Sequence, residues 1–276
     1  MKRPPVVAGL FYESDKDKLE KQLDFLLNKH EFGPKGIKED KRLVAGIVPH
    51  AGYAYSGAVA SWLYSRIPKG NFIIIGPNHY GLGYVYSVYP KGSWVTPLGE
   101  IKIDEKTVDS IVALPFIKPD VSAFANEHSI EVQLPFLQYR FGNNFKFVAV
   151  DVINDYPNNF FLETAEQIAK ILANLVENGW KLIATTDFSH YVPQETAEKI
   201  DKILIDDMLK LDPKQLFLDI IKYDATMCGF VPAAISVYLA KIMDLEPVFY
   251  TYKTSGDTTG DYSSVVGYAS IGFREK

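Results

Sequence analysis

The 276-residue chain has few or none of the features that mark secreted, membrane-spanning or nucleic-acid-binding proteins. It has one cysteine, Cys228, so no disulfide can form within the chain, and a lone thiol suits a reducing compartment. No run of about 18 consecutive apolar residues is present, and Pro4 and Pro5 interrupt the basic start of the sequence. We therefore expect neither a membrane span nor a secretory signal, and we predict a cytoplasmic protein.

An excess of positive charge is also missing. The chain has 29 Lys and Arg against 34 Asp and Glu, a net charge of -5. Proteins that neutralise many phosphates need basic side chains gathered on one face, so we expect no nucleic-acid partner. The chain shows no internal repeat, low-complexity segment or interdomain linker, and 47% of it is hydrophobic, which is enough for a substantial core. These observations predict a single domain over residues 1–276.

Short apolar runs alternate with longer segments of helical period. The runs predicted to be strands are 43–48, 72–75, 147–152 and 182–185, with a later pair near 247–252 and 264–271. The segments predicted to be helices are 56–67, 128–139, 162–178, 194–209 and 230–243. This alternation predicts an α/β fold with a mainly parallel central sheet and helices on both faces. Residues 83–103, rich in Tyr, Val and Trp with several glycines, favour antiparallel strands or a hairpin inserted at one edge.

Three of the five histidines directly follow predicted strands. They are His50, His79 and His190, whereas His30 lies in a polar stretch and is expected to be exposed. The carboxyl ends of parallel strands meet at one ligand crevice, so these three imidazoles are predicted to gather there. One such histidine is more often bound to a loop carbonyl, but three together favour a metal centre, an acid/base site, or both.

His128 and Cys228 are further candidates. Helical spacing would place His128 beside Glu131, which offers a carboxylate–imidazole pair, although acids at a helix N-terminus also simply favour the helix dipole. Cys228 precedes the predicted helix 230–243, where the dipole would stabilise a thiolate. A reactive or metal-binding thiol and a buried small hydrophobe are both compatible with this position.

Six segments together resemble the Memo family (mediator of cell motility), also called AmmeMemoRadiSam system protein B. They are RPPVVAGLFY at 3–12, PHAGY at 49–53, GPNH at 76–79, EHS at 127–129, DFSHY at 187–191 and MCG at 227–229. The resemblance implies a fold similar to that of the class III extradiol ring-cleavage dioxygenases, which are non-haem iron enzymes. It also implies that His50, His79 and Cys228 occupy metal-ligand positions, with His190 beside them as a candidate acid or base.

The implied ligand set differs from that of the dioxygenases, which hold Fe(II) with two histidines and a carboxylate. Cys228 falls where the carboxylate is expected, and a soft thiolate favours copper, particularly Cu(I), as an alternative to iron. The leading hypothesis is an iron or copper protein carrying out a redox reaction on an unidentified small molecule, with His190 and His128 transferring protons. The alternatives are a non-catalytic module that binds a peptide or phosphopeptide, and a metal-assisted hydrolase that works with Zn²⁺.

Overall fold

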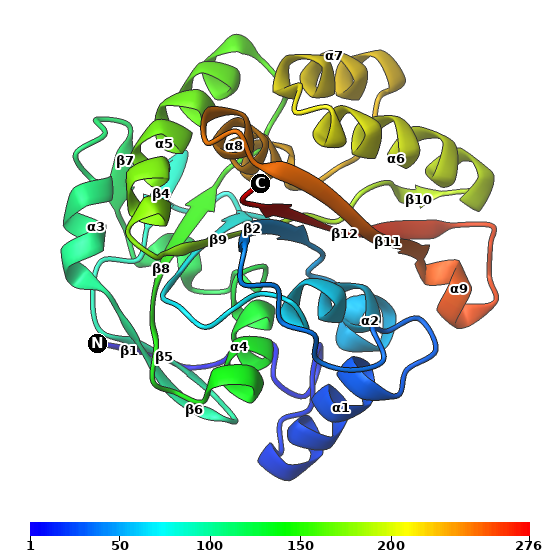
Figure 1. Ribbon diagram of the computed structural model, residues 1–276, viewed down its shortest axis with the longest axis horizontal. Coiled ribbons are helices and arrows are strands. Elements are labelled where there is room, and N and C mark those ends of the chain that lie inside the picture. Colours follow the sequence, from blue (N-terminus) through cyan, green and yellow to red (C-terminus); the bar gives the residue numbers. More distant parts are fainter.

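The central strands of the protein are the short apolar runs of its sequence. The computed structural model describes residues 1–276 (Figure 1). Its core strands are β2 (Leu43–Val48), β3 (Phe72–Pro77), β8 (Lys146–Val152) and β9 (Lys181–Thr185). They pair in parallel in the order β8-β3-β9-β2. Both sheet faces are covered at this point, which explains why these strands are continuous apolar runs without alternation.

Antiparallel and short strands extend the sheet on both sides to twelve strands in all. Next to β2 lies β12 (Val265–Arg274), which pairs antiparallel with β2, with β11 (Glu246–Thr254) and with β10 (His190–Val192). On the other side, β8 pairs with β6 (Gly99–Ile103) and with β4 (Tyr86–Val88). Beyond β6 lie β5 (Ser93–Thr96) and then β1 (Lys2–Arg3), and β7 (Ile117–Pro119) pairs with β4. β5 and β6 form an antiparallel pair and β4 runs antiparallel to β8, so the prediction for residues 83–103 is confirmed.

Two layers of helices enclose the sheet, which confirms the predicted α/β class (Figure 1). One layer contains α1 (Lys16–Asn28), α2 (Tyr53–Tyr64) and α4 (Leu134–Phe141). The other contains α5 (Asn159–Glu177), α6 (Gln194–Leu209), α7 (Pro213–Tyr223) and α8 (Phe230–Ile242). The short elements are α3 (Glu105–Ile111), α9 (Ser255–Thr259) and the 3₁₀ turns η1 (Ser122–Phe124) and η2 (Glu131–Gln133).

A single hydrophobic cluster of 75 buried residues runs through both layers. One contiguous core of this kind is the mark of one domain. None of the helices combines the length and the hydropathy needed to cross a bilayer.

The predicted helix 128–139 begins later than expected. Residues 127–130 form a loop, η2 begins at Glu131, and α4 begins only at Leu134. Pro135 sits in the first turn of α4, where its missing N–H costs nothing. The polar groups of the loop are used for other contacts, as described below.

Two carboxyl groups, Asp207 on α6 and Asp219 on α7, are buried together where these helices pack. Asp207 is 4% exposed and Asp219 is 6% exposed. Oδ2 of Asp207 has no hydrogen-bond partner. Burial and the neighbouring charge of Asp219 raise the pKa of Asp207 to about 6. Folding therefore shifts the ionisation of Asp207 to higher pH, so that at pH 7 the ionised form is held in an unfavourable site.

We predict that Asp207→Asn stabilises the protein at neutral pH. The pKa of Asp207 rises from 3.8 to about 6 on folding, so the stabilisation that wild type has below pH 4 is lost as the pH rises through 6. An asparagine cannot ionise, so the variant does not lose this stabilisation. The difference in unfolding free energy between the variant and wild type should therefore change in favour of the variant by roughly 1–3 kcal/mol from pH 4 to pH 7. Urea unfolding at both pH values measures this.

Asp206→Asn is the matched control, because Asp206 is the exposed neighbour on the same helix. Equal pH dependence of the Asp207 and Asp206 variants would contradict the prediction.

Candidate metal centre

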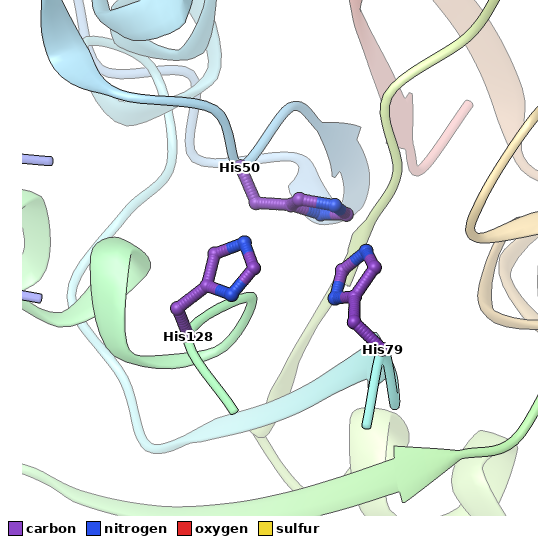
Figure 2. Close-up of side chains that lie close together, drawn as sticks. All are labelled: His50, His79 and His128. Atoms are coloured by element: carbon purple, nitrogen blue, oxygen red, sulfur yellow. The ribbon is translucent and has the colours of Figure 1, made fainter. Parts of the chain in front are cut away.

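Three histidines from distant parts of the chain converge at the carboxyl ends of the central strands (Figure 2). His50 follows β2, His79 follows β3, and His128 comes from the loop before η2. One ring nitrogen of each lies within 4.8 Å of those of the other two. Figure 2 shows the three rings pointing toward one another. The imidazole of His50 is buried while that of His79 is 31% exposed, so the cluster opens to solvent on the His79 side.

A buried carboxylate, that of Glu127, fixes His79. It accepts hydrogen bonds from the His79 backbone N–H at 2.7 Å and from Nδ1 at 3.0 Å. Burial lowers the pKa of His79, but the bond to Glu127 and the charges of Glu127 and Asp187 more than offset this, so the pKa is raised. For Glu127 the effects have the opposite signs. Burial alone would raise its pKa, but the hydrogen bond from His79 and the charges of His79 and His128 lower it to about 2. Nδ1 of His79 is thus the protonated nitrogen, and Nε2 is left for a ligand.

His50 is held by β9 and the segment after it. Its Nδ1 lies 2.8 Å from Oγ1 of Thr185, which also accepts a bond from Gln133 at 3.1 Å. Its backbone N–H donates to Asp187 Oδ1 at 2.9 Å. Burial lowers the pKa of His50, and the charges of His79 and His128 lower it further. The His50 ring is therefore neutral, which is the form that binds metal ions.

Cys228 reaches the cluster through His50. Its Sγ lies 3.2 Å from His50 Nε2 and accepts the backbone N–H of Asp187 at 3.2 Å. The residue lies just before α8, whose N-cap is Gly229. A side chain at position 229 would place its Cβ 2.4 Å from the Thr185 carbonyl oxygen, so only glycine lets the start of α8 approach the end of β9 this closely.

The electrostatics at Cys228 differ from the sequence expectation. We expected the dipole of α8 to favour a thiolate, but burial and the carboxylate of Asp187 raise the pKa of the Cys228 thiol well above its usual value. The sulfur is therefore a neutral thiol unless a cation replaces its proton.

His190 lies outside the group of three, in a segment that bonds to Thr226, two residues before Cys228. It begins β10, where its Nδ1 contacts the Thr226 carbonyl at 2.8 Å and its backbone N–H donates to Thr226 Oγ1 at 2.7 Å. A carbonyl only accepts, so Nδ1 carries the proton and Nε2 is free. Asp187, which we considered as a partner for His190, uses its carboxylate on the His50 backbone instead.

The expected pairing of His128 with Glu131 is wrong. Glu131 is fully buried and accepts bonds from Arg3 Nη1 at 2.6 Å and from the Tyr12 hydroxyl at 2.7 Å. The ring of His128 instead stacks on His79 at a centroid distance of 4.8 Å and contacts Phe11 edge-on at 4.7 Å. The helical spacing failed because residues 127–130 form a loop.

Sequence reasoning missed Arg3 as a site-supporting residue. Its buried guanidinium donates to the Phe124 carbonyl at 2.8 Å and to the Glu127 carbonyl, in addition to Glu131. These bonds tie the first strand to the loop that carries Glu127 and His128. The only signal was that Arg3 opens the first segment of the family resemblance.

Comparisons with known proteins agree with the resemblance. A family model described as Memo-like protein matches residues 3–272. A MEMO1 family protein of Methanobrevibacter smithii is 42% identical, over 98% of this chain and 99% of its own length. A MEMO1 family protein of Sulfolobus acidocaldarius is 41% identical over 99% of this chain and 99% of its own length. One of Aquifex aeolicus is 40% identical over 98% of this chain and 98% of its own length.

One solved structure, the uncharacterized protein JW3007 from Escherichia coli K12, has a similar fold, with a TM-score of 0.57. It is 14% identical in sequence, and the match covers 83% of this chain and 99% of that one, so it supports the fold alone. The family, in contrast, follows from sequence identity along nearly the whole length. The chain belongs to the Memo-like protein family.

Proposed function

We propose that this protein binds a redox-active metal ion, iron or copper, with His50, His79 and Cys228. The observation that carries the proposal is the convergence of three imidazoles whose nitrogen atoms lie within 4.8 Å of one another, next to the sulfur of Cys228. Metal–nitrogen bonds of about 2.0–2.1 Å hold donor atoms roughly 3–4 Å apart. The Cys228 sulfur already lies 3.2 Å from His50 Nε2, and the histidine nitrogens lie within 4.8 Å of one another.

The groups behind the donors support the proposal. Histidines that bind metals donate their second ring N–H to a carboxylate or another oxygen, which orients the ring. Glu127 does this for His79, and Thr185 lies in the corresponding position for His50. The free nitrogen of each ring then faces the cluster. At Cys228, a bound cation would take the place of the thiol proton.

The donor set favours iron or copper over a hard cation. Imidazole suits both metals, and a thiolate suits copper in its reduced state. The Glu127 carboxylate already accepts bonds from His79 and from the backbone of His128 and Ser129. Asp187 gives its Oδ1 to the His50 backbone N–H, and its Oδ2 lies 3.9 Å from His50 Nε2. When bound, the ion would supply one-electron chemistry for a small-molecule substrate.

His190 is proposed to handle a proton. The Thr226 carbonyl holds its Nδ1–H, which leaves Nε2 as the atom that gives or takes a proton beside the ion. His128 is a second candidate for this role, and its stacking on His79 also makes it an alternative metal donor.

We predict that His79→Ala and Cys228→Ser lose the bound metal, whereas His190→Ala retains it. The first two variants each remove a proposed donor atom, while His190 acts only on protons. Anaerobic purification followed by elemental analysis measures the metal content. His30→Ala is the matched control, since His30 lies on a different part of the molecule, against Phe25 and Phe32.

His128→Ala separates two donor sets. Loss of metal in this variant together with full retention in Cys228→Ser would mean that three histidines hold the ion, and the assignment of Cys228 would be wrong. Metal content equal to wild type in all the histidine and cysteine variants would overturn the proposed function.

We predict further that Glu127→Gln lowers the pKa of His79. In wild type this pKa is raised above 6.5 because the carboxylate offsets burial; in the variant the burial remains without the charge, so the pKa should fall below 6.5. Metal affinity should fall by about 10–100-fold, as is usual when an orienting group is removed.

NMR titration of the histidine ring protons after chelator treatment measures the change in pKa. The signal of His30 serves as the internal control. An unchanged pKa of His79 would show that Glu127 does not govern its protonation.

A further inference from the structure

Tyr191 has an unusual backbone conformation beside the cluster. Its φ is +59°, in the left-handed region, and it is the only strand residue among the five non-glycine residues with positive φ. A β-bulge causes this, because His190 pairs with Val266 and Val192 with Val265, which leaves Tyr191 unpaired. A bulky residue in this region costs about 1–3 kcal/mol.

Little packing within the folded chain offsets that cost. Tyr191 is 79% exposed, and its ring contacts only the edge of the preceding His190 ring among the aromatic side chains. Large aromatic rings are normally most stable when buried. Bulges beside active sites often re-aim a side chain, and backbone strain of this kind is typical of ligand-contacting residues. The conformation therefore points to a contact made with a ligand.

Another exposed tyrosine directly follows a histidine of the cluster. Tyr80 follows His79 and is 52% exposed. Tyr191 follows His190, and the centroids of these two rings lie 5.9 Å apart. On the His128 side, Phe11 contacts the His128 ring and also lines a groove of about 180 Å³, with Leu10 and Tyr55 among the other lining residues.

We propose that Tyr191 determines ligand specificity at the metal centre, by packing its ring against the planar unsaturated ring of a small molecule whose polar end binds at the histidines. This inference rests on the proposed metal site. The bulge fixes Tyr191 directly after His190, and the second exposed ring, that of Tyr80, directly follows His79.

Two probes that share a metal-chelating group test this inference. Benzohydroxamate carries a phenyl ring, and acetohydroxamate carries a methyl group in its place. Their dissociation constants are measured by titration of the metal-loaded wild type and variants. Tyr191→Ala should weaken benzohydroxamate binding about threefold to tenfold, since aromatic pairs contribute about 0.5–1.5 kcal/mol, and should leave acetohydroxamate binding unchanged.

Tyr191→Phe keeps the aromatic ring and should bind benzohydroxamate as tightly as wild type does. Phe249→Ala is the matched control, because Phe249 is an exposed ring on β11, in a groove shared with α6. Unchanged benzohydroxamate affinity in Tyr191→Ala, or equal weakening of both probes, would overturn the inference while leaving the metal site intact. A wild-type protein that holds no metal and binds neither probe would overturn the proposed function and this inference with it.

The strain is tested separately by thermal unfolding. Tyr191→Gly and Tyr191→Ala both remove the ring, but only glycine adopts positive φ without cost. The glycine variant should melt about 2–4 °C above the alanine variant. A glycine variant that melts no higher would show that the bulge is unstrained, which would remove the physical argument for a ligand contact.

Discussion

The arrangement of the three histidines depends on one buried carboxylate, that of Glu127. It accepts hydrogen bonds from the backbone and the ring of His79, and from the backbone N–H groups of His128 and Ser129. A buried carboxylate is costly unless its acceptor sites are filled, so losing any one of these hydrogen bonds would destabilise the buried charge of Glu127. The end of β3 and the loop before η2 are therefore held at a fixed separation without any bound ion.

Arg3 extends this network to the start of the chain. Its guanidinium is 5% exposed, lies over the Trp94 ring, and donates to the carbonyl of Glu127 and the carboxylate of Glu131. Glu131 in turn accepts the backbone N–H groups of Val6 and Val7. Removing either charge would leave the other buried and unpaired, which typically costs about 3–5 kcal/mol. The N-terminal segment is thus part of the support of the site.

The parts of the fold that follow local patterns could be predicted from the sequence. The strand Leu43–Val48 and the helix Gln194–Leu209 have the expected bounds, and the position of His50 and His79 after buried parallel strands predicted their meeting. Helices α1 and α7 were not predicted, although Asp15 and Asp212 cap them through their side chains, a signal that is visible in the sequence. Each of these two helices therefore begins at a capping aspartate that marks its start locally.

The loop around His128 was not predictable in this way. Its conformation is set by Arg3, 124 positions before Glu127 in the chain, and no periodicity encodes a contact over that distance. The protonation of Cys228 was likewise misjudged, because the helix dipole is a local feature whereas burial and the carboxylate of Asp187 come from the tertiary fold. Local sequence thus indicated which residues meet, and long-range packing decided how they are charged and oriented.

The position of β12 has a consequence for how the protein is made. This strand lies next to β2, at the edge of the parallel core, and it consists of residues 265–274, which follow every histidine and cysteine of the site in the sequence. A ribosome releases the segments of His50, His79 and His128 long before it completes α8 and β12. Strand β2, which leads to His50, therefore gains its antiparallel neighbour β12 only late in synthesis, and the proposed donor set is complete only after Cys228 has been added.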